Sequence, residues 1–228
     1  MILRTIASLC LMACSLSACV GQDGVKDLFN GKDLSGWKGN LELWSVKDGA
    51  ITGRTSADKP LKFNTFLVWD GGEVDDFELD LDYRIEGEKA NSGIQYRSKL
   101  IKADDFVVGG YQADIDATLT FAGINYEEKG RGIIAKRGTR STIDAEGKIQ
   151  AEEIAKDEDL KKVIKSGDWN HYRVVAKGNK LSHSINGTLM SETIDNQADK
   201  AAKKGILALQ IHVGPPMVVQ FKNIRLKQ

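Results

Sequence analysis

Three short segments combine amides, carboxylates, an arginine and a histidine in alternation with apolar residues. They are Gly93–Arg97, Tyr111–Asp116 and Leu209–Val213. Because successive side chains of a β-strand point to opposite faces, this alternation predicts strands with an apolar back and a polar front. The predicted front carries Gln95, Arg97, Gln112, Asp114, Asp116, Gln210 and His212. If the strands share one sheet, its front suits a polyhydroxylated ligand.

The elements that must position these side chains are short β-like runs separated by turn signals. Phe77–Ile85 alternates apolar and polar residues almost without fault, and Asp48-Gly49 and Asn186-Gly187 are typical of hairpin turns. Pro215-Pro216 marks a loop before the last strand. The fold class predicted is all-β, an antiparallel β-sandwich.

One segment departs from the strand pattern. Glu152–Ile164 carries apolar residues at near-helical spacing, with Gly167 just beyond it. We therefore expect one short amphipathic helix inserted in the sandwich, over an edge or a mouth. A shorter helical turn at Gln197–Lys203 is a further candidate element.

Composition limits the classes of function. The chain has 228 residues, of which 41% are hydrophobic and 28% charged, and its formal net charge is zero. This is ordinary globular composition, sufficient for one large domain. Nucleic-acid binding requires concentrated cationic surface, which a neutral chain with only scattered lysine pairs lacks, so we exclude that class of partner.

The N-terminus has the pattern of a processing segment. Residues 1–18 hold one positive charge and an apolar stretch too short to span a bilayer, which predicts a signal peptide. Leu16-Ser17-Ala18-Cys19 resembles a bacterial lipobox, so Cys19 is the expected lipidation site, with Leu11–Cys14 a weaker candidate and plain secretion the alternative. We expect a lipidated linker over residues 19–26 and one domain over 27–228.

This reading predicts a periplasmic or cell-surface lipoprotein, anchored to the membrane through Cys19 without a spanning helix. All three cysteines lie in the N-terminal segment. The mature domain therefore has no disulfide, and its stability must come from a hydrophobic core.

Several motifs, in order, resemble the 3-keto-disaccharide hydrolase domain family. They are Leu28–Trp37, Asn91-Ser92-Gly93-Ile94 with Arg97, Gly130-Arg131-Gly132 after Tyr126-Glu127, Trp169-Asn170, Gly205–His212 and Val219–Ile224. The resemblance covers nearly the whole mature chain. It implies a concanavalin-A-like jelly roll, a saccharide substrate and cleavage of a glycosidic bond.

A sugar oxidised to a ketone at C3 has an acidified hydrogen at C2. Removing that proton expels the C1 substituent, and water then adds back. Such a site needs a base for the C2 hydrogen, a group that stabilises the enolate, and an acid for the departing oxygen. The predicted front offers all three kinds of group.

Asp114, Asp116 and His212 are the candidate acids and bases. Two residues apart on one strand face, the two aspartates would lie about 6.7 Å apart, so both could touch one sugar. Mutual repulsion would raise one pKa, and imidazole titrates in the working pH range. Structural roles are the alternative for all three, and the pattern does not assign acid and base. His171 and His183 are expected to be structural or surface residues.

Arginines and aromatic residues complete the candidate site. Arg97 and Arg131 are the favoured catalytic cations, because a guanidinium fork matches enolate and hydroxyl oxygens. The expected substrate contacts are Gln95, Gln112, Gln210, Tyr111, Tyr126, Glu127, Lys136 and Arg137. An aromatic residue of a sandwich more often belongs to the core.

No cofactor motif occurs, and no contiguous metal-binding spacing such as His-Glu-x-x-His is present. A divalent metal ion held by Asp114, Asp116 and His212 is an alternative, since it would acidify the C2 hydrogen by binding the ketone.

Two other functions compete. A retaining glycosidase of the laminarinase type needs a further carboxylate after Asp114-Ile115-Asp116, but Ala117, Thr118 and Leu119 follow instead. A non-catalytic carbohydrate-binding module needs only polar strand faces and exposed aromatic residues. The sequence does not exclude this second alternative.

Overall fold

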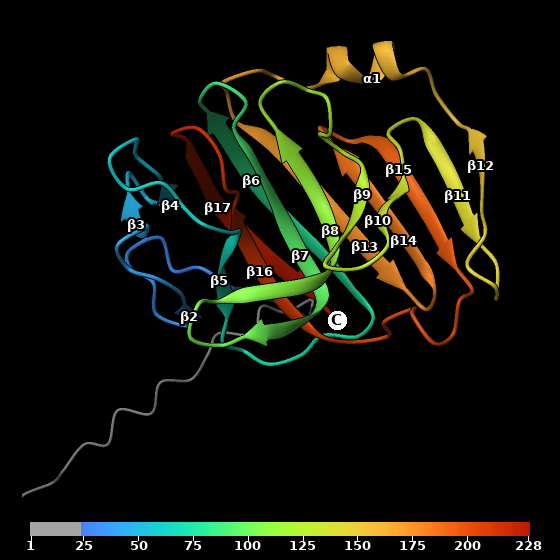
Figure 1. The fold of residues 1–228 in the computed structure, drawn as a ribbon, viewed down its shortest axis with the longest axis horizontal. Coiled ribbons are helices and arrows are strands. Elements are labelled where there is room, and N and C mark those ends of the chain that lie inside the picture. The colour runs from blue at the N-terminus through green and yellow to red at the C-terminus, as the bar shows by residue number, and fades with distance from the viewer. Residues whose placement is uncertain (1–23) are drawn as a thin grey trace, which may run out of the picture.

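The computed structural model describes residues 24–228 as two stacked β-sheets and one short helix, α1 (Asp157–Val163) (Figure 1). Sheet A contains, in spatial order, β12 (Ile149–Glu153), β11 (Thr139–Ile143), β15 (Thr188–Asp195), β14 (Lys180–Ile185), β13 (Asn170–Lys177), β6 (Phe77–Glu86), β17 (Val218–Lys227), β4 (Ala50–Arg54) and β3 (Trp44–Lys47), with β1 (Val25–Asp27) also on β17. Sheet B contains β10 (Gly132–Ala135), β9 (Asn125–Glu128), β8 (Val107–Asp116), β7 (Asn91–Lys102), β16 (Ile206–Ile211), β5 (Thr65–Trp69) and β2 (Trp37–Lys38).

The architecture confirms the predicted all-β sandwich. Every strand pair is antiparallel except β11 with β15, which run parallel. The turns predicted from Asp48-Gly49 and Asn186-Gly187 close hairpins, and all four residues have the positive φ that such tight turns require. β1 pairs with β17, so the sandwich starts at Val25, within the segment expected to be linker.

The hydrophobic core lies between the sheets. On β6, the alternate residues from Phe77 to Ile85 are buried, as the alternation predicted. Ala113 and Ile115 of β8 and Ile94 of β7 enter the same core from sheet B. Their strand neighbours therefore point to the outer face of sheet B.

A second, small apolar cluster lies on that outer face. It consists of Phe66, Val68, Val108 and Ala208, with Phe106 and Ile206 packed against it. The β7–β8 hairpin curls over this cluster, where the Phe66 amide donates to the Phe106 carbonyl at 3.0 Å. The hairpin therefore covers one end of this outer sheet face.

The predicted helix at Glu152–Ile164 was too long. Glu152 and Glu153 end strand β12, which pairs with the edge strand β11, and the helix is confined to α1. Backbone pairing to an open sheet edge outweighs the helical spacing of the first residues. The Gln197–Lys203 segment forms a single turn, in which the Lys200 and Ala201 amides donate to the Gln197 carbonyl.

Within residues 24–228, no helix has the length and apolar character needed to cross a membrane. The expected signal peptide and the Cys19 lipidation site lie outside the described residues.

Arg137, a predicted substrate contact, instead fastens α1 to the loop after β8. Its buried guanidinium pairs with Asp157 of α1 at 2.7 Å and donates to the carbonyl oxygens of Ala122 and Leu119 at 2.5 and 2.8 Å. Lys136, the other basic candidate of this segment, is exposed. Arg137 therefore fixes a loop rather than a ligand.

We expect Arg137→Met to lower the free energy of unfolding by about 2–4 kcal/mol, because two carbonyls lose their donor at a buried position. Urea denaturation measures the effect. Lys136→Met is the matched control and should change stability by less than about 0.5 kcal/mol. Equal stability of the two variants would contradict the structural role of Arg137.

Candidate functional site

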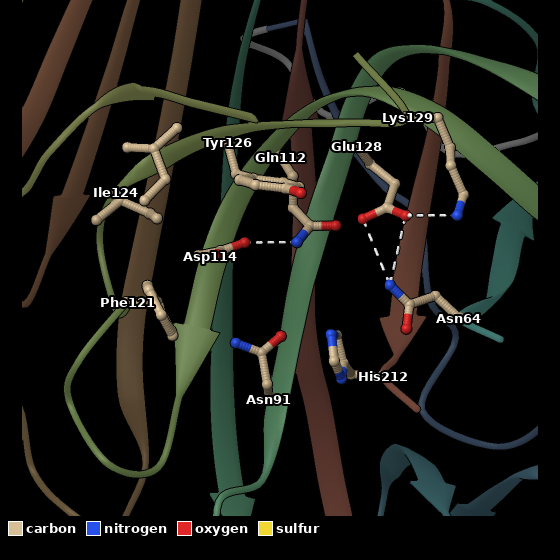
Figure 2. A pocket seen from close by; sticks show the side chains of 11 residues that line it. Asn64, Asn91, Gln112, Asp114, Phe121, Ile124, Tyr126, Glu128, Lys129 and His212 are labelled. Carbon is tan, nitrogen blue, oxygen red and sulfur yellow. Dashed lines mark hydrogen bonds and ion pairs between the residues drawn. The ribbon is translucent and has the colours of Figure 1, made fainter. Parts of the chain in front are cut away.

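A cavity of about 380 Å³ opens on the outer face of sheet B (Figure 2). We call it the Asp114 pocket. Its walls are formed by Asn64, Asn91, Gln112, Asp114, Phe121, Ile124, Tyr126, Glu128, Lys129, Ile133 and His212. Of the residues predicted from sequence, the structure brings Gln112, Asp114, Tyr126 and His212 together here.

A chain of buried amides holds the Asp114 carboxyl. Gln95 donates to the Gln112 amide oxygen at 2.7 Å, and the Gln112 amide nitrogen donates to Asp114 Oδ1 at 2.5 Å. Gln210 accepts more weakly from Gln112, at 3.5 Å. Gln95 and Gln210 are fully buried, so they support the floor of the pocket instead of touching a ligand.

The absence of a side chain at Gly93 leaves the space that the Gln112 side chain occupies when it donates to the Asp114 carboxyl. Gly93 pairs with Asp114 across β7 and β8, and a Cβ at Gly93 would stand 2.5 Å from Gln112 Cγ and Cδ. Any other residue at position 93 would push the Gln112 amide off the carboxylate. The Asn91-Ser92-Gly93-Ile94 motif thus serves the site through its glycine.

The environment of Asp114 favours the protonated acid. Burial raises the pKa of its carboxyl well above 3.8, and the negative charges of Glu128 and Asp116 raise it further, while the hydrogen bond from Gln112 lowers it. Only 5% of the residue is exposed. A carboxyl that keeps its proton at higher pH is suited to general acid catalysis.

His212 faces Asp114 across the pocket with a defined tautomer (Figure 2). Its Nδ1 lies 2.5 Å from the Val213 carbonyl oxygen, which can only accept a hydrogen bond. Nδ1 therefore carries the proton of the neutral ring, and Nε2 keeps a free lone pair. Asn64 fixes the same strand end by accepting from the Val213 amide at 2.9 Å.

Glu128 is a pocket carboxylate that the sequence reasoning missed. Asn64 donates to both of its oxygens at 3.4 Å, and Lys129 Nζ lies 3.7 Å away. Tyr126 pairs with Gln112 across β8 and β9, so Glu128, two residues further, shares its face. That alternation is the available signal for Glu128, whereas the substrate contact predicted from the sequence is the neighbouring Glu127. Asn91 lies on β7 two residues before Gly93, so the same alternation places it on this face, whereas Asn64 and Phe121 carried no such signal.

Asp116 supports a loop at the edge of the pocket. Its carboxylate accepts from the amides of Thr118, Thr120 and Phe121 and from the Thr118 hydroxyl, at 2.7–3.1 Å. These donors occupy the oxygens that a metal ion would need. Among residues 24–228, no group of three or more histidine, cysteine, aspartate or glutamate side chains is arranged to hold a metal, so the proposed set of Asp114, Asp116 and His212 is not formed.

Arg97, predicted beside Asp114, lies elsewhere. A β-bulge interrupts β7 after Tyr96, and Arg97 has a φ of 44°, so its side chain leaves the polar front and reaches toward sheet A. The buried guanidinium donates to the carbonyls of Asp75 and Gly178 and pairs with Asp76 at 2.8 Å. Arg97 therefore joins the two sheets.

Arg131 also serves a network outside the pocket. It pairs with Glu127 at 2.5 Å and with Asp195, at the end of β15, at 2.6 Å. The Tyr111 hydroxyl donates to the same Asp195 carboxylate at 2.6 Å, while its ring lies in the core. The substrate contacts predicted for Tyr111 and Glu127 and the catalytic role predicted for Arg131 have no place in the Asp114 pocket.

The other two histidines lie outside the pocket. His183 is buried between the sheets, where it accepts from the Tyr96 hydroxyl and donates to the Ile124 carbonyl, and burial lowers its pKa to about 4. His171 lies between Asp80 and Asp82 on sheet A. Both were expected to be structural or surface residues.

The sequence of residues 24–227 matches the family model described as the 3-keto-alpha-glucoside-1,2-lyase-like domain. No curated protein matches the chain.

Solved structures share the fold. A proposed glycosyl hydrolase of Parabacteroides distasonis superposes with a TM-score of 0.59 at 20% identity, covering 90% of this chain and 98% of that one. The carbohydrate-binding module CBM66 of Bacillus subtilis gives 0.57 at 15% identity, covering 85% and 96%. A Bacillus subtilis protein with a galectin-like fold gives 0.56 at 11%, covering 86% and 90%. At these identities the likeness establishes the fold alone.

The raised pKa of Asp114 predicts how stability depends on pH. The folded state binds the carboxyl proton more tightly than the unfolded state, so its contribution is complete below about pH 4 and is lost as pH rises through the folded pKa. Asp114→Asn has no proton to lose there and can still accept from Gln112. We expect the variant to gain stability relative to the wild type as pH rises above about 4, measured by urea denaturation. A constant difference above that pH would contradict the raised pKa.

Proposed function

Because the chain belongs to the family of 3-keto-alpha-glucoside-1,2-lyase-like domains, we propose that it cleaves 3-keto-glycosides by elimination in the Asp114 pocket. One observation carries the proposal. A carboxyl that favours its protonated form and an imidazole with a free Nε2 lone pair face the same cavity. Elimination requires one proton donor and one proton acceptor that face the same bound substrate.

His212 is the base. Its Nε2 takes the C2 proton, and the electrons of the C2–H bond form the enolate with the C3 ketone. The hydrogen bond from Nδ1 to Val213 keeps the ring oriented and stabilises the imidazolium that results.

Asp114 is the acid. As the enolate collapses, the C1–O bond breaks, and the departing glycosidic oxygen takes the Asp114 proton. A C1–C2 double bond conjugated to the ketone remains. The Asp114 carboxylate then removes a proton from water, whose oxygen adds at C1, and the His212 imidazolium returns a proton to C2. Both residues regain their starting states, so the net reaction is hydrolysis.

The enolate needs N–H donors, and the arginines expected to supply them are outside the pocket. Two other side chains lining it can donate, Asn91 through its amide and Lys129 through its ammonium. Lys129 is the one lysine or arginine among the described residues that line the cavity. We propose that the Asn91 amide, which lies nearer to Asp114 and His212 in Figure 2, donates to the ketone oxygen as its negative charge develops, whereas Lys129 lies beside Glu128.

The position of Glu128 favours a second candidate function. With Asp114 it supplies two carboxyl groups to one cavity, as direct hydrolysis of an unoxidised glycoside would need. The two residues come from β8 and β9, so the absent third carboxylate after Asp116 does not exclude this chemistry. A binding module without turnover is the remaining alternative.

Incubation with methyl 3-keto-glucosides of both anomeric forms and with the parent methyl glucosides separates these functions. We expect cleavage of a keto form only. His212→Gln and Asp114→Asn should each lower kcat/KM by about a hundredfold or more, because each removes one proton-transfer group.

His171→Gln is the matched control on sheet A, and its kcat/KM should equal that of the wild type. Cleavage of the parent glucosides at the same rate would instead support two-carboxylate hydrolysis. Saturable binding of the sugars with no turnover of either would support a binding module.

We further propose that the protein is a lipoprotein at the periplasmic membrane or the cell surface, attached through Cys19. The lipobox-like Leu16–Cys19 supports this. In cells that process lipoproteins, the full chain should enter the membrane fraction and carry a diacylglyceryl mass increment, whereas Cys19→Ala should be recovered without that increment. An unmodified wild-type Cys19 would contradict the anchor.

A further inference from the structure

The Asp114 pocket has two unlike walls, and Asp114 stands between them. Figure 2 shows Asn64 and His212 on one side of the carboxyl. Phe121 and Ile124 lie on the other side. With Tyr126 and Ile133, which also line the cavity, they form what we call the apolar wall, defined as Phe121, Ile124, Tyr126 and Ile133.

Two of the four residues of the apolar wall are exposed to solvent, whereas Ile124 is buried. Phe121 is 42% exposed and Ile133 is 39% exposed, although they come from different segments, the loop after β8 and strand β10. Exposed apolar side chains that gather at the rim of a polar cavity mark a binding surface for an apolar group. Neither side chain is needed to fill the core, which lies on the opposite face of sheet B.

Hydrogen bonds to Asp116 and Arg137 fix the loop that carries Phe121. Asp116 accepts from the amides of Thr120 and Phe121, and Arg137 donates to the carbonyls of Leu119 and Ala122. A loop restrained at both its amides and its carbonyls presents its side chain with little conformational entropy left to lose on binding. These contacts also give Asp116 and Arg137 a role in the site.

We propose that the apolar wall is the leaving-group subsite and that the preferred substrates are 3-keto-glycosides with an apolar aglycone. This inference rests on the proposed function, in which Asp114 protonates the glycosidic oxygen. An oxygen held at Asp114 has the keto-sugar on the side of His212 and Asn64. The aglycone then lies against Phe121, Ile124 and Ile133.

Comparison of hexyl and methyl 3-keto-glucosides tests the proposal, because both leaving groups are primary alcohols and differ in apolar surface. We expect the wild type to cleave the hexyl compound with a kcat/KM at least tenfold higher. Phe121→Ser and Ile133→Ser should each lower the hexyl-to-methyl ratio severalfold. Two variants from separate elements guard against a local folding defect in either one.

Ile149→Ser is the matched control, since Ile149 is 41% exposed on β12, outside the pocket, and should leave the ratio unchanged. Equal kcat/KM for the two compounds in the wild type would overturn the subsite while the proposed function stands. An unchanged ratio in both pocket variants would also overturn it. If neither compound is cleaved, the proposed function fails, and the inference fails with it.

Discussion

The site depends on one constraint, the burial of the Asp114 carboxyl on a sheet face that supplies amide partners and no neighbouring cation. Gln95 and Gln112 satisfy the carboxyl by hydrogen bonding, and Gly93 leaves the space in which Gln112 can cross to it. Neutral amides orient a carboxyl without compensating its charge, so burial dominates its pKa. A salt bridge at the same position would have held the acid ionised and unable to donate a proton.

The fold keeps the three candidate arginines, Arg97, Arg131 and Arg137, away from Asp114 by giving them other partners. Arg97 and Arg131 join sheet B to sheet A through ion pairs with Asp76 and Asp195, while Arg137 joins α1 to the loop that carries Phe121. Each guanidinium is used to hold backbone segments or acidic side chains in place. These three guanidinium groups therefore hold the segments around the pocket in place but do not line it.

Alternation predicted the sheet face, and the structure shows where local geometry limits such a prediction. Gln95, Gln112, Asp114 and Gln210 share a face as period two requires, because β8 and the relevant parts of β7 and β16 are regular. Arg97 does not, since a bulge with positive φ changes its direction, and no residue type in that run signals a bulge. Glu128 needed the register of β9 against β8, and Phe121 and Asn64 lie in loops whose course depends on tertiary contacts. The helix is shorter than predicted because residues 149–153 pair with the edge strand β11. The sequence of this segment alone does not indicate that a sheet edge lies beside it.

The central claim is that cleavage begins with loss of the C2 proton to His212, assisted by a protonated Asp114. Single-turnover cleavage of a 3-keto-glucoside deuterated at C2, compared with the unlabelled compound, tests this step most directly. The account predicts slower cleavage of the deuterated compound, because the C2–H bond breaks in the step that leads to release of the leaving group. Equal single-turnover rates for the two compounds would contradict it.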